Sequence, residues 1–204
     1  MTGKLVLIGG VSGVGKTTLA ERLCRVMGCP NIRIHNYVLK IAKERMVDPI
    51  KKWDSLLRKS VPLIIEDVER WQFAVCDYHF AIQPRYDTAY AVGEIIEEDL
   101  NEPYVKGLCD AVLKIDEWSK IRVYPLLLDA PTNHILSRRK RACNIKRPRS
   151  LNPKSIEVEK KYERQYFEEA RNLLDENHGY SKVVKNKEGS FEQTFKGVLE
   201  HIMQ

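Results

Sequence analysis

Residues 4–17 have the sequence KLVLIGGVSGVGKT, in which a short apolar run is followed by a segment with four glycines and then by Lys16 and Thr17. The apolar run is too short for a typical helix, and its length and flanks favour a buried parallel strand. From Lys16 onward apolar residues recur at helical spacing until Gly28 and Pro30, which are typical stop signals. The sequence therefore predicts a strand over 4–10, a glycine-rich loop and a helix over 16–27 in direct succession.

The loop matches the pattern G-x-x-x-x-G-K-[ST] and lies between a strand and a helix, where that pattern binds phosphate. Glycines let the backbone wrap closely around a polyphosphate, and the helix start adds positive potential. The flanking strand and helix disfavour the alternative, a turn with an incidental Lys-Thr pair. In a nucleoside triphosphate complex we expect Lys16 to bridge the β- and γ-phosphates, Thr17 to coordinate Mg²⁺ and Thr18 to contact an α-phosphate. Main-chain contacts are expected from Gly10, Ser12, Gly13, Val14 and Gly15.

Strands and helices keep alternating along the rest of the chain. Further strands are expected at 31–35, 73–77, 121–129 and 180–185, and further helices at 36–46, 53–71, 94–100, 105–118, after Pro131, at 162–174 and at 191–202. Asn36 is expected to cap the second helix, Pro62 to split the third, and Ser190 with Gln193 to form a capping box. The alternation predicts one α/β domain over residues 1–204, with a parallel sheet covered by helices on both faces.

The composition is that of a folded protein, with 204 residues of which 43% are hydrophobic and 30% charged, and it does not match disordered, collagenous or coiled-coil chains. No run approaches the roughly 20 apolar residues that cross a bilayer, so we expect a cytoplasmic protein. The five cysteines are odd in number and never spaced Cys-x-x-Cys, which predicts reduced, mostly buried thiols rather than disulfides or a zinc site. The net charge of +6 favours an anionic partner: a nucleotide, a phosphometabolite or RNA.

Polar residues follow the strand expected at 73–77, at the sheet edge where open α/β folds bind ligands. Asp77 ends this strand and is a candidate for holding Mg²⁺ through water, with a solvated acid as the alternative. His79 and Arg85 are candidate substrate contacts, although a single histidine is often only a hydrogen-bonded loop residue. Arg58, in the preceding helical segment, could grip a second anionic substrate, or it could be a surface arginine.

Residues 138–149 hold seven basic side chains within twelve positions, on a helix and the loop after it. Phosphoryl transfer spreads negative charge over the transferring group, so arginines that close over the phosphates would stabilise the transition state. Arg138 and Arg141 can share a helix face, because neighbouring helical positions diverge by about 100° while positions three apart lie close. These two arginines are candidate catalytic residues. An RNA-binding patch and a solvated face are the alternatives.

The chain resembles the adenylate kinases of archaeal type, which are small P-loop nucleoside monophosphate kinases. The resemblance rests on the glycine loop, on Asp77-Tyr78-His79, on the arginine-rich segment and on the stretch VVKNKEG at residues 183–189. It implies a three-layer P-loop NTPase fold with five parallel strands in the order 2-3-1-4-5, helices on both faces and a lid over 139–156. It also implies an acceptor-binding arm over 36–72, with Asn36 and Arg58 as acceptor contacts, and a turn from Asn186 that approaches the base of ATP.

Two departures from the family leave the acceptor open: a longer connection, expected as a helical insertion over 94–117, and a lid sequence without the family's acidic residues. We therefore expect an ATP- and Mg²⁺-dependent phosphotransferase that acts on a small acceptor, in the first place a nucleoside monophosphate. Such an enzyme works by alignment and charge stabilisation without a covalent nucleophile. The alternatives are a kinase of a non-nucleotide phosphometabolite and an RNA- or ribosome-associated ATPase or nucleotide-gated binding protein.

Overall fold

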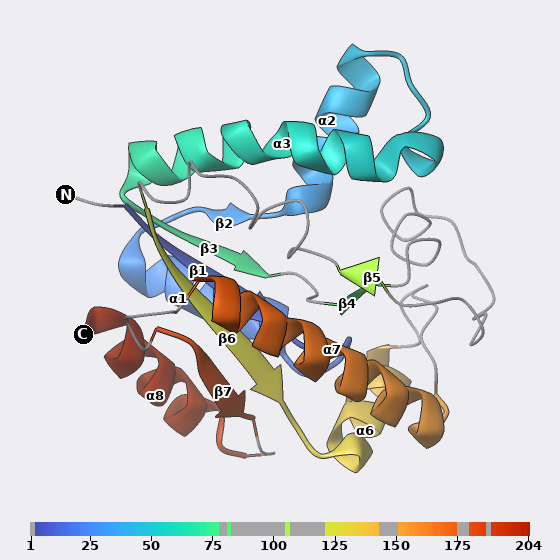
Figure 1. The fold of residues 1–204 in the computed structure, drawn as a ribbon. Coiled ribbons are helices and arrows are strands. Elements are labelled where there is room, and N and C mark those ends of the chain that lie inside the picture. The colour runs from blue at the N-terminus through green and yellow to red at the C-terminus, as the bar shows by residue number, and fades with distance from the viewer. Residues whose placement is uncertain are drawn as a thin grey trace.

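The apolar run near the N-terminus forms the central strand of a five-stranded sheet (Figure 1). The computed structural model describes residues 3–77, 81–82, 105–106, 121–142, 151–174, 180–186 and 189–204. The strands are β1 (Gly3–Gly9), β2 (Asn31–Ile32), β3 (Phe73–Asp77), β6 (Ile121–Asp129) and β7 (Lys182–Lys185). All their pairings are parallel, and the order β2-β3-β1-β6-β7 confirms the expected order 2-3-1-4-5.

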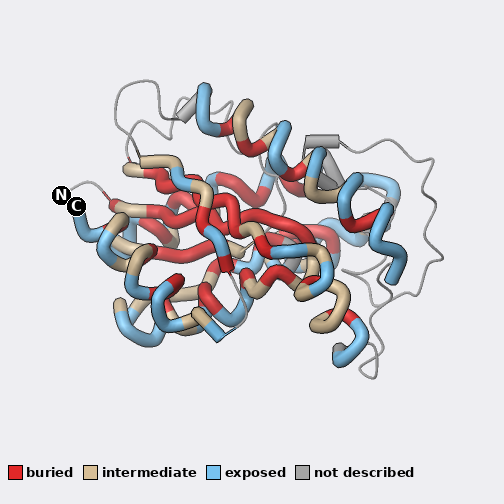
Figure 2. The backbone as a smooth tube through the Cα atoms, turned by 90° about the horizontal axis from the view of Figure 1, so that it is seen from below, coloured by how far each residue is buried: buried red, intermediate tan, exposed pale blue. Residues whose placement is uncertain are grey.

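Alternate side chains of β1 enter two different cores, one on each face of the sheet. Val6 and Ile8 pack with α1 and α8, whereas Leu5 and Leu7 pack with α2 and α3. The helices are α1 (Lys16–Met27), α2 (Ile34–Glu44), α3 (Pro49–Trp71), α6 (Thr132–Ala142), α7 (Pro153–Leu174) and α8 (Phe191–Met203). Because both faces of β1 are covered, its sequence is continuously apolar from Leu5 to Ile8 rather than alternating. Figure 2 shows the buried strands enclosed by partly exposed helices.

A second, two-stranded antiparallel sheet is formed by β4 (Ala81–Ile82) and β5 (Val105–Lys106). The helix expected over 105–118 is therefore wrong at its first two residues, where cross-strand pairing holds the chain extended. The rest of that helix, the helix expected at 94–100 and the insertion over 94–117 apart from β5 lie outside the described residues.

The second strand and helix are shifted relative to the sequence prediction. β2 ends at Ile32 and α2 begins at Ile34, so Asn36 lies in the first turn of the helix, where its backbone N–H donates to the Arg33 carbonyl at 2.9 Å. The reason is packing, because Ile34 is buried and starts the apolar stripe that continues through Val38. Met46, the last residue of the helix expected at 36–46, lies beyond α2 with a φ of 52° and is exposed.

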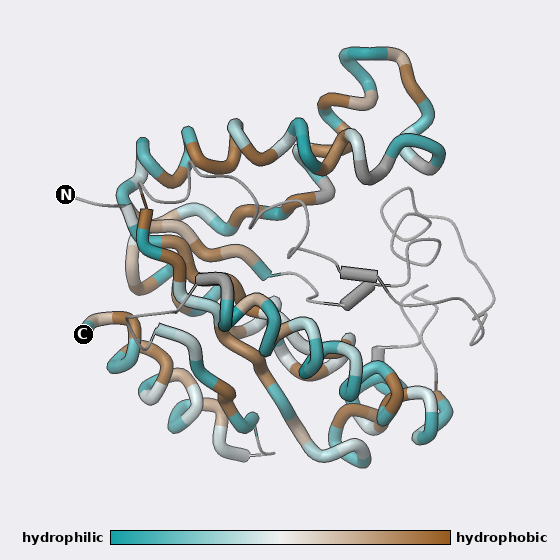
Figure 3. Tube along the Cα trace, in the orientation of Figure 1, coloured by the Kyte–Doolittle hydropathy of each residue, from teal (hydrophilic) through white to brown (hydrophobic). Residues whose placement is uncertain are grey.

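Helix α3 continues through Pro62, so the expected split at this proline is wrong. The helical geometry is instead interrupted at Lys52, where φ is −125° and ψ is 17°. Figure 3 shows α3 with apolar and polar residues on different sides. Its buried positions lie on both sides of Pro62 and include Leu57, Val61 and Val68. Burial of such side chains contributes about 2 kcal/mol each, which together outweighs the roughly 3 kcal/mol that an interior proline costs.

We expect Pro62→Ala to stabilise the protein by about 2 kcal/mol, because alanine restores an N–H that can donate to the Arg58 carbonyl and removes the ring from an exposed helix position. Urea unfolding of both proteins measures the change. Lys59→Ala, at another exposed position of α3, is the control and should shift stability by less than about 0.5 kcal/mol. An unchanged or lower stability of Pro62→Ala would argue against a helix that continues through Pro62.

Two further helix details differ from the prediction. Helix α7 begins at Pro153, well before the expected start at 162; its buried side chains include Ile156, Phe167 and Ala170, whereas Tyr162 and Tyr166 are half-buried with ring centroids 6.4 Å apart. Ser190 lies at the N-cap of α8 but makes no side-chain capping hydrogen bond. Its carbonyl instead accepts the Thr194 hydroxyl at 3.1 Å, so the expected capping box is not formed.

The cysteines that the structure describes are free thiols, but only one of these three is buried, whereas we expected mostly buried thiols. Cys76 is buried, and burial raises the pKa of its thiol, while Cys24 and Cys29 are half-buried. Cys109 and Cys143 lie outside the described residues. Among the helices in the described ranges, none has an apolar stretch long enough to span a bilayer.

Candidate active site

The loop between β1 and α1 needs glycine at two positions for different reasons. Gly10 has a φ of +129°, and a Cβ there would collide with the carbonyl oxygen of Leu128 in β6. Gly15 has a φ of +107°, and a Cβ there would lie 2.7 Å from Nδ2 of Asn186. At both positions a side chain is disfavoured for two reasons: the backbone is left-handed, and a neighbouring atom lies too close to where the Cβ would be. The loop is thus fitted against β6 and the chain after β7.

The Lys16 side chain is buried against the loop that precedes it. Its ammonium group donates to the carbonyl of Gly10 and, at 3.3 Å, to the carbonyl of Val11. A lysine ammonium carries three donors, and carbonyl dipoles hold its charge in place of water. The structure therefore places the Lys16 ammonium directly on the glycine loop.

Thr17 and Asp77 come together at the first turn of α1, although sixty residues separate them. The Thr17 hydroxyl donates to Oδ2 of Asp77 at 2.7 Å. The other carboxylate oxygen, Oδ1, is buried and has no hydrogen-bond partner among the described residues. A buried carboxylate oxygen without a donor is a position that a cation or a water molecule fits. A hydroxyl and a carboxylate fit Mg²⁺, which keeps several waters and needs few protein ligands.

The described residues contain no cluster of three or more His, Cys, Asp or Glu that could hold a metal ion. Mg²⁺ does not require such a cluster, because it is usually bound through one or two carboxylates together with substrate phosphates. The Thr17–Asp77 pair therefore fits a magnesium ion that arrives with a phosphate ligand.

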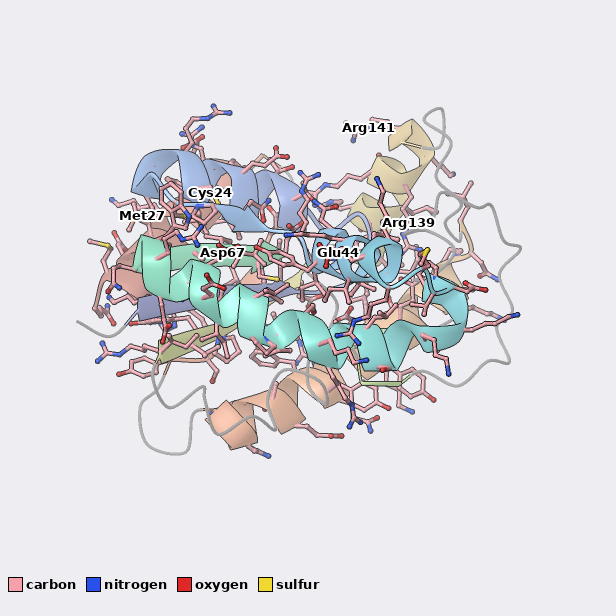
Figure 4. The ribbon with its side chains drawn as sticks, turned by 90° about the horizontal axis from the view of Figure 1, so that it is seen from above. Cys24, Met27, Glu44, Asp67, Arg139 and Arg141 are labelled. Carbon is pink, nitrogen blue, oxygen red and sulfur yellow. The ribbon has the colours of Figure 1, made fainter. Side chains whose placement is uncertain are left out.

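The three arginines near the end of α6 lie in different surroundings. Arg138 donates to the Val14 carbonyl at 2.9 Å, so it lies on the loop. Arg139 is buried and donates to the Ser12 carbonyl at 2.9 Å, while Arg141 is exposed and donates to Ser137 Oγ on its own helix at 3.1 Å. Figure 4 shows Arg139 and Arg141 on α6. Within the described part of the basic segment, Arg138 and Arg139 thus donate to the loop, whereas Arg141 donates to its own helix.

Asn186 fixes the loop from the side of β7. Its backbone N–H donates to the Asp129 carbonyl at 2.7 Å, and its buried Nδ2 donates to the Val14 carbonyl at 2.8 Å. Val14 therefore receives hydrogen bonds from both Arg138 and Asn186. The residues that follow, 187–188, lie outside the described part of the chain.

A pocket of about 280 Å³ opens beside the loop, between the end of β6 and α7. Buried Glu163 accepts the Gly10 N–H at 3.2 Å, and Asp129 forms ion pairs with Lys160 at 3.3 Å and Arg164 at 3.6 Å. The pocket lining consists of Gly10, Val11, Leu127, Leu128, Asp129, Glu157, Lys160, Lys161, Glu163 and Arg164. The pocket is therefore a concave site with a charged lining directly beside the glycine loop.

No protein-family model matches the sequence, and no curated protein matches it either. Solved structures do match the fold. Thymidylate kinase from Candida albicans matches with a TM-score of 0.54 and 16% identity, over 99% of this chain and 92% of that chain. Shikimate kinase from Acinetobacter baumannii, in complex with shikimate, matches with a TM-score of 0.52 and 15% identity, over 100% and 94%. Deoxyadenosine kinase from M. mycoides, with bound dATP, matches with a TM-score of 0.52 and 14% identity, over 98% and 100%.

The chain has the fold of the P-loop kinases. Within this P-loop kinase fold, the structure brings most of the sequence-predicted phosphate-site residues together at the carboxyl edge of the sheet. Lys16, Thr17 and Thr18 open α1, Asp77 ends β3, and Arg138 and Asn186 contact the loop.

The two described residues that we predicted to contact the acceptor lie on separate elements of the P-loop kinase fold. Asn36 lies exposed on α2 and Arg58 exposed on α3, two helices joined by a hydrogen bond from the Tyr37 hydroxyl to Asp67 at 2.5 Å. Burial and this carboxylate raise the pKa of Tyr37, so its hydroxyl stays protonated. His79 and Arg85 lie outside the described residues. The expected lid is described only at its ends, where Arg139 and Ile156 are both buried.

In this P-loop kinase fold, α7 supplies two site residues that the sequence did not predict. Glu159 and Glu163 are four positions apart and therefore share one helix face. The available signal was the helical spacing of Glu159 and Glu163 within the charge-rich stretch 157–164. That pattern normally indicates a solvated face, which is why it did not single out the pocket.

Proposed function

We propose that the chain is an ATP- and Mg²⁺-dependent phosphotransferase that moves the γ-phosphate to a small acceptor, with a nucleoside monophosphate as the first candidate. The observation that carries the proposal is the arrangement at the start of α1. A buried lysine, Lys16, rests on the glycine loop, and the next residue, Thr17, donates to the carboxylate of Asp77. A triphosphate on this loop would meet backbone N–H groups, a cation and a magnesium-binding pair.

In this proposal the protein aligns the reactants and stabilises charge. Lys16 would exchange its loop carbonyls for phosphate oxygens, and Arg138, already on the loop, would reach the transferring group together with Arg141. When held by Thr17 and by water on Asp77, Mg²⁺ supplies positive charge to the phosphates. The acceptor oxygen would attack the γ-phosphorus in line as the bond from that phosphorus to the β–γ bridging oxygen breaks and ADP leaves, and no covalent bond to the protein forms.

The pocket beside the loop supports a small polar acceptor, because its charged lining lies next to Gly10 and Val11. The sequence resemblance to archaeal-type adenylate kinases favours a nucleoside monophosphate. The matched structures are named for thymidylate, shikimate and deoxyadenosine, so a nucleotide, a non-nucleotide acid and a nucleoside all belong in the test. Asn36, Arg58, His79 and Arg85 remain the predicted acceptor contacts, and Asn186 remains the predicted neighbour of the ATP base.

The test is ADP production from ATP and Mg²⁺ with AMP, GMP, CMP, UMP, TMP, shikimate, deoxyadenosine or no acceptor. We expect one nucleoside monophosphate to raise the rate at least about tenfold over the no-acceptor reaction, since an in-line acceptor replaces water. Detection of the phosphorylated acceptor confirms transfer rather than stimulated hydrolysis. Equal ADP production in every reaction would contradict the proposed transfer to these acceptors.

A second candidate function is an RNA-associated ATPase. The observation that favours it is a pair of exposed basic side chains at the end of α6, Lys140 and Arg141. The chain as a whole has a net charge of +6. Binding of this kind would weaken steeply with salt because bound counterions are released. Measuring RNA affinity between low and physiological salt, alongside acceptor-independent ATP hydrolysis, separates this candidate from the first.

A further inference from the structure

Arg139 is one of the largest fully buried side chains among the described residues, with only 2% of its surface exposed. A buried guanidinium is costly unless its donors are satisfied. Arg139 meets this condition through three elements: it projects from α6, donates from Nε to the Ser12 carbonyl, and donates from both terminal nitrogens to Glu159 on α7 at 3.0 and 2.5 Å. The residue therefore joins the phosphate-binding loop to a distant helix.

The hydrogen bond to Ser12 constrains the peptide that Ser12 shares with Gly13. In a planar trans peptide the C=O and N–H groups point in opposite directions. A carbonyl held toward Arg139 therefore turns the Gly13 N–H away from it. The stem of Arg139 also packs on Gly13, because a Cβ at this glycine would lie 3.1 Å from Cγ of Arg139.

Helix α7 reaches the loop at two points, one helical turn apart. Glu163 accepts the N–H of Gly10 directly at 3.2 Å. Glu159 reaches Ser12 only through Arg139, since in the described part of the chain its carboxylate hydrogen bonds all go to that arginine. A shift of α7 would thus change the loop at Gly10 and at Ser12. Lys160, three positions before Glu163, lines the pocket together with Glu163.

We propose that Arg139 is a positioning residue that holds the Ser12–Gly13 peptide in its phosphate-binding conformation and, through Glu159, couples ATP affinity to the position of α7. The inference rests on the proposed function, because it assumes that the loop binds ATP. On this proposal, a ligand that binds in the pocket and contacts α7 would change the affinity of the loop for the nucleotide.

The test is ATP binding without acceptor, measured by titration calorimetry at a temperature where every variant is folded by circular dichroism. We expect Arg139→Met to weaken ATP binding about tenfold and Glu159→Gln about fivefold, the equivalents of roughly one charge-assisted and one neutral hydrogen bond. In the Arg139→Met background, Glu159→Gln should have no further effect. Arg139→Lys should bind ATP more tightly than Arg139→Met, because its ammonium can still reach one partner. Glu168→Gln is the matched control, since Glu168 pairs with Arg171 at 3.3 Å on the exposed surface of α7 and should leave ATP affinity unchanged.

Two results would overturn the inference while leaving the proposed function intact. One is a Glu159→Gln protein with normal ATP affinity and a lower thermal midpoint, which would make the Arg139–Glu159 pair purely structural. The other is an equal effect of Glu159→Gln with and without Arg139. If Arg139→Met does not fold, Glu159→Gln and Arg139→Lys still decide the question. Failure of the unmodified protein to bind ATP would instead overturn the proposed function.

Discussion

Replacing Lys16 with alanine is expected to lower ATP-dependent phosphoryl transfer about a thousandfold, the scale on which removal of a preorganised charge contact acts. The ammonium already rests on the Gly10 and Val11 carbonyls, so the folded protein holds its cation at the loop before substrate arrives. Negative charge on the β–γ bridge in the transition state would then lose its nearest cation. Single-turnover measurements with the best acceptor give the chemical rate independently of product release.

The control for Lys16→Ala is Lys196→Ala on α8. Lys196 is exposed and its ammonium lies 3.9 Å from Glu200, so its loss removes the same charge far from the loop. We expect this control to keep normal transfer. Thermal unfolding of Lys16→Ala must show a folded protein for the comparison to count. A folded Lys16→Ala protein with near-normal transfer would remove the loop from the proposed mechanism.

Replacing Asp77 with asparagine is expected to lower transfer about a hundredfold at ordinary Mg²⁺ and to raise the Mg²⁺ concentration that gives half-maximal rate. The amide oxygen can still accept the Thr17 hydroxyl, so the local fold should persist. What disappears is the negative charge and the buried Oδ1 acceptor, which has no partner among the described residues. Rates measured across a Mg²⁺ series separate weakened metal binding from a general loss of activity.

Asp67→Asn offers a closely matched control for Asp77→Asn. Asp67 also accepts a hydroxyl, from Tyr37 at 2.5 Å, but it lies on α3, away from α6 and its arginines (Figure 4). We expect this variant to keep the normal Mg²⁺ dependence while losing some stability. The same Mg²⁺ dependence in Asp77→Asn and the unmodified protein would show that Asp77 is a solvated or structural acid.

The parts of the site that could be predicted from sequence are those that local chemistry determines. The loop from Gly10 to Thr17 carries its own glycines, cation and hydroxyl, and it is followed at once by its helix. Strand β3 ends in a single acid, so Asp77 could be placed at the sheet edge without knowledge of packing. The strand order followed from the family resemblance rather than from the residues alone.

The contacts made by α7 could not be predicted, because they depend on how the helix is rotated against β6. The helix is rotated so that Glu163 and Phe167 are buried, whereas Tyr162 and Tyr166 are half-buried. This rotation decides which charged side chains reach the loop. By sequence alone, Arg139 is one of several basic residues in the segment 138–149. Residue spacing does not reveal that its guanidinium pairs with the carboxylate of Glu159 on α7. At Pro62 a local helix-breaking rule was overridden by apolar burial on both sides.

The lengths of the strands in the sheet bear on how the protein behaves at high concentration. The long strands β1 and β6 are central, whereas the edges are β2, with two residues, and β7, with four. An edge strand with unpaired backbone groups is a template for pairing with another chain, and short or lysine-bearing edges block this. β7 begins and ends with exposed lysines, Lys182 and Lys185. Neither edge of the sheet therefore offers a second molecule a long, uncharged strand on which aggregation could begin.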